Sequence, residues 1–485
     1  MTRLSTSAAK FNAADEERKF GDIANSEAAR WLEDHAPLLE CPEPVLEEIF
    51  DFRYWTFRKH IRTTPEGQIV TEFLPDVPWA GAYNSINAAA GFHFREGRWL
   101  RGTEDLFKSY LIFWMRGSGN EQLYTAWLPH AAWDWCCVTG EFDFGVSLLP
   151  DFIRDYETWE AKDMTESGLF YSVDDRDAME DSISGSGLRP TKNGAMYGSA
   201  CAIAKFAALA GDEETRLRFE KKAADLKAKV DALLWDGDFY RVIPECCMEA
   251  ANKGTFDFSQ VPETHYVREE LGYVPWYFNL PDEDKACAFT QLLTEDGFKA
   301  PFGITTAERR HPRFNFEFDH ECLWNGPVWP FATSQTLVGA ANLLHKQKQN
   351  VFTKEDYYAL LLQYAKSQYM DTEEGRICWI DEDMDPFTGR WLARDILKAQ
   401  GFPELYGGYE RGRDYNHSLF CDLVLSGLLG IDPNGETLSA DPMVPDSWNW
   451  FRVQHIPFRG GLYTVAFDRD GTKYGKGSGV RIEKE

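Results

Sequence analysis

Hydrophobic residues recur at helical spacing along most of the chain. Phe219, Ala223, Leu226, Val230 and Leu233 are four, three, four and three residues apart, which predicts an amphipathic helix ending near LWDGDFY. Another such stripe runs through SQTLVGAANLLHK. Between the predicted helices lie long loops rich in aromatic residues, glycine and proline, and loops of that length usually build a site. We therefore predict an all-α fold, a toroid of helical hairpins whose loops meet at one end.

The pattern changes near the C-terminus. The segment GLYTVAFDRDGTKYGKGSGVRI alternates apolar and polar residues and carries an Asp-Gly turn, which predicts a β-hairpin. Nothing before it resembles a flexible linker. We therefore divide the chain into residues 1–438, the helical domain, and residues 439–485, a small β-rich appendage packed on it.

Composition narrows the class of ligand. The chain has 485 residues, 44% hydrophobic and 15% aromatic, so it can bury a large core. Its net charge of −27 repels nucleic-acid phosphates and anionic lipid surfaces. No apolar stretch is long enough for a membrane span. We expect a small or neutral substrate and no nucleic-acid or membrane partner, and we leave association into a homo-oligomer open.

The N-terminus and the cysteines bear on the compartment. MTRLSTSAAKFNAADEERKFGD has no apolar core of the secretory type. The ten cysteines are spread thinly, and no CxxC pair with metal spacing occurs. We expect reduced thiols and a cytoplasmic location.

Two acidic clusters lie about 200 residues apart. DDRDAMEDSISGSG, residues 174–187, has five acidic residues among its first eight and precedes an apolar helix, and WIDEDMDPFTGRW spans residues 379–391. Cleavage of a glycoside requires one protonated carboxyl group and one ionised carboxylate. Aromatic, partly dry surroundings raise the pKa of the first, and hydrogen bonds keep the second ionised. Taken singly, such clusters are more often solvated loops or helix caps.

A tryptophan-rich turn lies between these clusters in the chain. In ECLWNGPVWPFATSQ, the bend at Gly326-Pro327 is expected to place Trp324 and Trp329 side by side. Pro330 suits the first turn of the following helix, where its missing N–H costs nothing. The alternative interpretation is ordinary core packing at a turn.

Together these stretches resemble glycoside hydrolase family 63 and its mannosylglycerate hydrolase relatives, part of the wider six-hairpin group that includes trehalases. NGPVWP is similar to the family's R/N-G-P-x-W-P signature, AMEDSIS to its GMDNSP segment, and DEDMDPFTG to its YENYNPxTG segment. The motifs occur in family order over residues 75–430, approximately. The resemblance implies an (α/α)6 toroid and a cofactor-free, metal-free, inverting exo-hydrolase. Its substrate would be a short α-linked glycoside or a glycosyl-glycerate-like compound.

The resemblance also implies the catalytic residues. The family's general acid falls on Glu180 and its general base on Glu382. Because the family acid is normally Asp, the neighbouring Asp181 is an alternative proton donor. The segment GYERGRDYNHSLFCDLV has no counterpart of this length in the relatives.

Aromatic and polar residues of the long loops complete the predicted site. Aromatic rings suit the flat faces of sugars, and arginine forks suit sugar hydroxyls or a carboxylate on the aglycone. Ion pairs that cap the last hairpin are an equally good interpretation of the arginine-rich segment. The residues predicted to bind substrate are Trp79, Tyr83, Asn84, Trp133, Asp134, Arg189, Trp324, Asn325, Trp329, Trp379, Arg411, Tyr415 and His417.

A metal site finds little support. His311, Asp319, His320 and Glu321 lie close in sequence, but they lack the i, i+4 histidine spacing of metal-binding helices. We therefore expect no metal ion.

Two other function classes stay open. A sugar epimerase or polysaccharide lyase can use the same toroid, with His417, Tyr415 or His320 carrying the proton instead of the glutamate pair. A non-catalytic sugar-binding module is a third interpretation, which does not explain two acidic clusters beside aromatic residues.

Overall fold

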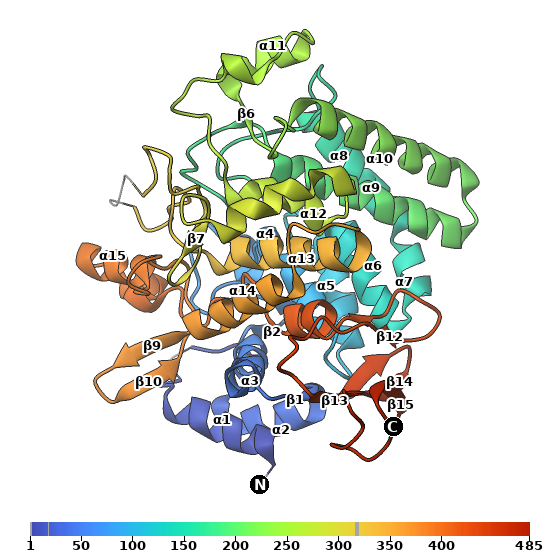
Figure 1. Ribbon diagram of the computed structural model, residues 1–485, viewed down its shortest axis with the longest axis vertical. Coiled ribbons are helices and arrows are strands. Elements are labelled where there is room, and N and C mark those ends of the chain that lie inside the picture. The colour runs from blue at the N-terminus through green and yellow to red at the C-terminus, as the bar shows by residue number, and fades with distance from the viewer. Residues whose placement is uncertain (1, 18, 316–319) are drawn as a thin grey trace.

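Six pairs of helical elements follow one another in the computed structural model, which describes residues 2–17, 19–315 and 320–485 (Figure 1). The pairs are α3 (Pro44–Lys59) with α4 (Asn87–Gly97), α5 (Glu104–Arg116) with α6 (Leu128–Thr139), α8 (Leu149–Asp163) with α9 (Pro190–Ala210), α10 (Glu213–Leu233) with α12 (Val274–Tyr277), η5 (Glu283–Leu293) with α13 (Pro330–Lys346), and α14 (Lys354–Ser367) with η8 (Leu423–Leu428).

The second members of the pairs form an inner ring. Neighbours pack together in the order α4, α6, α9, α12, α13 and η8. The ring closes between α4 and η8, because the carboxylate of Glu96 accepts hydrogen bonds from the backbone N–H groups of Phe420, Cys421 and Asp422 at 2.8–3.0 Å. The predicted all-α (α/α)6 toroid is confirmed.

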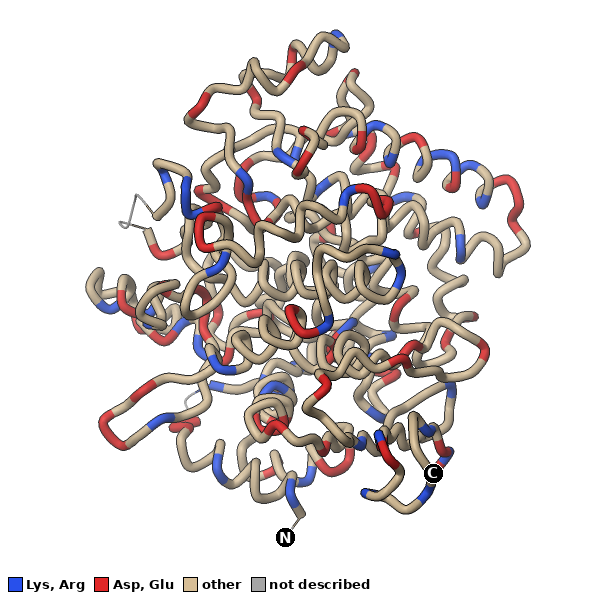
Figure 2. Tube along the Cα trace, viewed as in Figure 1, with Lys and Arg blue, Asp and Glu red and all other residues tan. Residues whose placement is uncertain are grey.

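The predicted helices form for the expected local reasons. In α10 the stripe residues Phe219, Leu226 and Val230 are buried, α13 begins at Pro330, and Thr353 and Asp356 form a capping box at the start of α14. The inner helices carry few charges, whereas charges crowd the outer helix α10 (Figure 2). None of the helices in the described residues has the length and apolar character that crossing a membrane requires.

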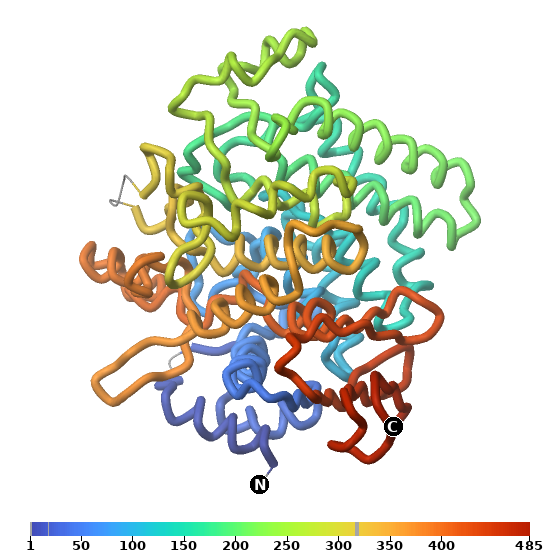
Figure 3. Tube along the Cα trace, in the orientation of Figure 1, coloured from blue at the N-terminus to red at the C-terminus, as the bar shows by residue number. Residues whose placement is uncertain are grey.

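The tail forms the predicted β-hairpin and more. β13 (Trp450–Phe458), β14 (Gly461–Asp468) and β15 (Gly479–Lys484) make an antiparallel sheet, whose fourth strand is β1 (Leu38–Glu40). Leu39 of β1 pairs with Val453 of β13, so a segment near the start of the chain lies beside the C-terminal strands (Figure 3). The division at residue 438 stays a prediction.

Shorter elements decorate the toroid. They are α1 (Arg3–Ala13), α2 (Asn25–His35), α7 (Phe142–Ser147), α11 (Met248–Asn252), α15 (Leu392–Gln400), the paired strands β2 (Ile61–Thr64) and β3 (Gly67–Val70), β4 (Tyr171–Ser172) with β5 (Gly187–Leu188) and β6 (Ile243–Pro244), β7 (Lys299–Ala300) with β8 (Gly303–Ile304), β9 (Tyr369–Thr372) with β10 (Gly375–Cys378), and β11 (Ile431–Asp432) with β12 (Ser439–Ala440).

Candidate active site

The first acidic cluster is folded around one arginine. Arg189, fully buried just before α9, donates from Nε and Nη2 to Asp177 at 2.7 and 3.1 Å. Its Nη1 donates to Asp174 at 3.1 Å, to Ser182 at 2.8 Å and to the Gly185 carbonyl at 2.7 Å. Part of the acidic run therefore compensates a buried cation and shapes the loop. The hydrogen bonds of Arg189 are thus made within the protein, and Arg189 does not line the cavity described below.

Two carboxyl groups of this loop, Asp175 and Glu180, line a cavity, and Glu180 is the predicted proton donor. It is half-buried, and burial raises its pKa, while Cys322 and His320 oppose that rise. Asp181 lies on the solvent side, with 57% of its side chain exposed and one carboxylate oxygen 3.7 Å from His320. Of the two alternative proton donors, the structure brings only Glu180 to the cavity wall.

The second acidic cluster turns its carboxylates in different directions. Asp381 accepts from the indole N–H of Trp379 at 3.2 Å and from the backbone N–H of Glu382 at 2.9 Å, and burial raises its pKa to about 7. Asp383 accepts from the backbone N–H of Ala393 at 2.9 Å. These two aspartates are bound within the loop, and Glu382 between them faces the cavity.

Glu382 differs from Glu180 in having a guanidinium partner. Nη2 of Arg411 lies 3.0 and 2.7 Å from its two carboxylate oxygens, and Nη1 lies 3.1 Å from Oε1 of Glu321. Burial raises the pKa of Glu382, and Arg411 is the main opposing influence. An adjacent cation favours the ionised carboxylate, so the surroundings suit Glu382 as a base and Glu180 as an acid.

Both glutamates line one cavity of about 270 Å³. Cys322 lines the same cavity, and burial, together with the charges of Glu180 and Glu382, raises the pKa of its thiol. Trp79, Trp329 and Tyr124 supply aromatic walls. The remaining lining residues are Glu72, Phe73, Ile86, Ala88, Asp175, Ala178, His320, Glu321, Arg411, Tyr415 and His417.

The structure gathers part of the predicted site. Trp79, Glu180, Trp329, Glu382, Arg411, Tyr415 and His417 line the cavity. Tyr83, Asn84, Trp133, Asp134, Asp181, Arg189, Trp324, Asn325 and Trp379 do not.

Two of the residues outside the cavity support those that line it. Trp324 stacks on Trp329 with ring centres 4.3 Å apart, as the Gly-Pro bend predicted. Asn84 binds the carbonyls of Phe73 and Pro75 at 3.1 and 2.9 Å and thus fixes the loop that carries Trp79.

Three lining residues carry useful chemistry that the sequence did not point out. Glu72 lies at the start of the aromatic loop TEFLPDVPWAGAYNS, and an acidic residue beside aromatic ones was the available signal. Tyr124 lies in a loop without a distinguishing pattern, and Cys322 directly precedes the tryptophan-rich turn. Only the folded arrangement brings them beside the two glutamates.

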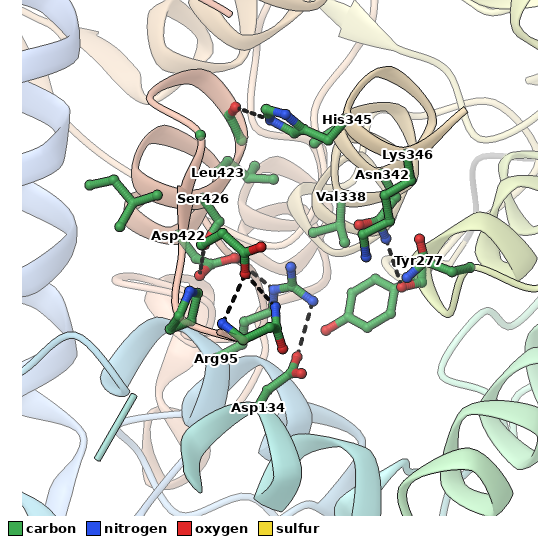
Figure 4. Close-up of a pocket in the computed structure, with 18 of the residues that line it drawn as sticks. Arg95, Asp134, Tyr277, Val338, Asn342, His345, Lys346, Asp422, Leu423 and Ser426 are labelled. Carbon is green, nitrogen blue, oxygen red and sulfur yellow. Dashed lines mark hydrogen bonds and ion pairs between the residues drawn. The ribbon is translucent and has the colours of Figure 1, made fainter. Parts of the chain in front are cut away.

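A second and larger cavity, of about 560 Å³, lies at the other end of the inner ring (Figure 4). Trp329 lines the first cavity and Asn342 the second, and Asn342 lies 13 positions after Trp329, which is about 20 Å along the helix. Asp134 faces this second cavity, where Arg95 Nη1 lies 3.3 Å from it. Trp133 is adjacent on α6 and packs on Phe206. Neither residue lies with the glutamate pair.

Among the described residues, no group of three or more His, Cys, Asp or Glu side chains is arranged to hold a metal ion. Of the four residues considered for a metal, Asp319 lies outside the described part of the chain. His311 contacts the backbone carbonyl of Glu263 at 3.3 Å, and His320 lines the first cavity.

Comparisons with known proteins agree with this architecture. Residues 82–418 match the family model of the mannosylglycerate hydrolase MGH1-like glycoside hydrolase domain, and residues 431–483 match that of the glycosyl hydrolase family 65 C-terminal domain. No curated protein matches the chain.

Solved structures share the fold. One named as a sialidase is 35% identical with a TM-score of 0.89, and the match covers 99% of this chain and 43% of that one. A GH78 rhamnosidase of Bacillus sp. GL1 is 15% identical with a TM-score of 0.59, covering 93% and 42%. A GH63 mannosylglycerate hydrolase from Thermus thermophilus is 11% identical with a TM-score of 0.51, covering 77% and 98%. The chain thus spans less than half the length of the first two.

Proposed function

Because the chain belongs to the family of mannosylglycerate hydrolase MGH1-like glycoside hydrolase domains, we propose that it hydrolyses a short α-linked glycoside with inversion at the anomeric carbon. Family membership confirms the resemblance seen in the sequence. The observation that carries the proposal is that Glu180 and Glu382, from loops about 200 residues apart, line the same cavity. That arrangement supplies the two carboxyl groups that glycoside hydrolysis requires.

The two carboxyl groups have different tasks. Glu180, whose pKa is raised by burial, holds a proton and delivers it to the glycosidic oxygen as the bond breaks. Glu382, whose negative charge Arg411 stabilises against the effect of burial, takes a proton from a water molecule that attacks the anomeric carbon from the opposite face. The first product therefore carries the inverted, β configuration.

The size of the cavity supports exo action. At about 270 Å³ it is slightly smaller than the usual range for small-molecule sites, about 300–1,000 Å³. A single sugar unit fits such a space better than a long chain does. We therefore place the terminal sugar between the two glutamates and the aglycone toward the exposed side near Trp79, of which 38% is accessible.

NMR of the first product tests this function. A panel of α-linked disaccharides and glycosyl-glycerates is incubated with the protein, and the anomeric signal is followed from the first turnovers. Initial release of the β-anomer supports inversion, and initial release of the α-anomer contradicts it. A panel that stays intact contradicts hydrolysis.

A sugar epimerase or lyase is the second candidate. One observation favours it: Tyr415 and His417 line the same cavity, with the tyrosine hydroxyl 2.8 Å from the imidazole Nδ1. The products separate the candidates, since hydrolysis releases a reducing end, a lyase product absorbs ultraviolet light, and epimerisation leaves the glycosidic bond intact.

A cytoplasmic location is also part of the proposal. Each of the ten cysteines, all within the described residues, is free, which suits a reducing compartment. Cell fractionation tests the location. Self-association stays a prediction, and light scattering of the purified chain tests it.

A further inference from the structure

The charges around the first cavity are strongly unbalanced. Arg411 is the only lysine or arginine among its described lining residues. A carboxylate on a ligand would therefore meet like charges in surroundings partly shielded from water, which is strongly unfavourable. The five acidic residues that line the cavity are Glu72, Asp175, Glu180, Glu321 and Glu382.

The single guanidinium is already engaged. Arg411 directs Nη2 to Glu382 and Nη1 to Glu321, and its Nε is buried. Recognition of a substrate carboxylate by arginine uses two parallel N–H groups. Arg411 can offer such a pair only by releasing Glu382. The arginine-rich segment was expected to bind either sugar hydroxyls or a carboxylate. Arg411 has no free pair of N–H groups for a carboxylate.

Two buried polar atoms of the cavity wall lack a partner. Oε1 of Glu72 lies 2.8 Å from Nδ1 of His417, which leaves Oε2 of Glu72 and Nε2 of His417 unpaired. Only 4% of Glu72 and 3% of His417 is exposed. Buried polar groups are nearly always hydrogen-bonded in native structures. Hydroxyl groups of a bound sugar would complete both.

The imidazole is held in place for this task. The ring of His417 stands perpendicular to Phe331, with centres 4.3 Å apart, and edge-on to Phe92 at 5.9 Å. Tyr415 and Glu72 fix its Nδ1 side. A group that is already oriented loses little freedom when a ligand binds.

From these observations we propose that the sugar bound between Glu180 and Glu382 is neutral, and that Glu72 and His417 bind its hydroxyl groups. The inference rests on the proposed function and names the substrate class of that site. Sialic acids and uronic acids are disfavoured by the same charges.

Calorimetric binding tests the substrate class without depending on hydrolysis. The probes are neutral monosaccharides, deoxy sugars included, together with glucuronate, galacturonate, mannuronate and sialic acid. The expected result is that at least one neutral sugar binds the intact protein about 100-fold more tightly than any acidic one. An acidic sugar that binds best, or a panel in which nothing binds, overturns the inference. Binding of neutral sugars while every glycoside stays intact supports the inference and contradicts only the hydrolytic function.

The variant Glu72→Gln tests the assigned residue. It keeps the shape of the side chain but removes the charge, so neutral-sugar affinity should fall about 10- to 100-fold while discrimination against acidic sugars narrows. Glu214→Gln, an exposed position in the first turn of α10, is the matched control and should change neither. If Glu72 had only a structural role, the ratio of neutral-sugar to acidic-sugar affinity would stay the same in Glu72→Gln. An unchanged ratio therefore overturns the role proposed for Glu72.

Discussion

The two ends of the toroid treat buried charge in opposite ways. At the loop end, carboxyl groups outnumber cations, and burial raises the pKa of Glu180, Glu382 and Asp381. At the other end, Asp422 is surrounded by donors: Nε of Arg95 at 2.6 Å, Nη2 of Arg98 at 2.6 Å and the indole of Trp99 at 2.8 Å. These partners lower the pKa of Asp422 despite its complete burial.

The difference separates stability from chemistry. A carboxylate with a lowered pKa stabilises the folded state at neutral pH, and one with a raised pKa is tolerated at a cost in folding free energy. Asp422 and the two arginines close the inner ring between α4 and η8 (Figure 4). The ion pairs of Asp422 stabilise the fold at the other end, and the fold in turn tolerates the buried glutamates at the loop end.

The largest expected effect is on turnover at the loop end. Glu382→Gln removes the group that activates water, so kcat should fall about 10³- to 10⁴-fold. The fold should survive, because Arg411 keeps Glu321 as a partner. The measurement is kcat on the best substrate of the panel, together with the unfolding midpoint. Glu374→Gln, in the exposed turn between β9 and β10, is the control, and near-normal turnover of Glu382→Gln would refute the assignment.

The converse change at the other end should affect stability. Asp422→Asn leaves Arg95 and Arg98 without their shared carboxylate, and breaking a buried ion pair in this way costs about 3–5 kcal/mol. Chemical denaturation measures the loss. Because the pKa of Asp422 is lowered in the folded state, its contribution is present above the unfolded value of about 3.9 and is lost only as pH falls below it. The deficit should therefore be constant between pH 5 and 8.

Asp432→Asn is the control for this end. Asp432 lines the same cavity, but among the described residues its carboxylate accepts hydrogen bonds only from the nearby Asn434, so its replacement should cost little. Equal destabilisation by the two substitutions would show that the cavity, not the charge network, determines stability there.

The next largest expected effect is on kcat/KM and distinguishes the two alternative proton donors. Glu180→Gln should lower kcat/KM about 10²- to 10³-fold on substrates with a poor leaving group, because the leaving oxygen then receives no proton. Asp181→Asn should change it less than about threefold, since that side chain is 57% exposed and lies off the cavity wall. Steady-state kinetics on one glycoside decides the matter. The reverse ranking would transfer the role to Asp181.

Local patterns predicted the scaffold well, and the two ends show where they stop. Helical spacing, the capping box at Thr353 and the proline at 330 act over a few residues, so the sequence reveals them. The motif order placed Glu180 and Glu382 in one cavity. Asp134, by contrast, is the seventh residue of α6, and the direction of that helix takes it to the second cavity.

Residues that act through long-range contacts could not be recognised from the sequence. Glu72 matters because it pairs with His417. Arg189 was predicted to contact substrate, but it pairs with Asp174 and Asp177 instead. Whether an arginine is free for a ligand depends on which carboxylates surround it in space. The spacing of residues along the chain does not predict which carboxylates surround an arginine.

The smallest effect that we predict is a shift in the pH dependence of kcat/KM on replacing Arg411. Its guanidinium opposes the burial that raises the pKa of Glu382, so Arg411→Gln should raise that pKa further. A base works only when it is deprotonated, and the acidic limb of kcat/KM should therefore move to higher pH, by about one unit or more. Arg411→Lys keeps a positive charge and should shift the limb less, although lysine lacks the paired donors. Because kcat/KM reports ionisation in the free enzyme, a limb that stays in place in Arg411→Gln would mean that Glu382 does not act as the base.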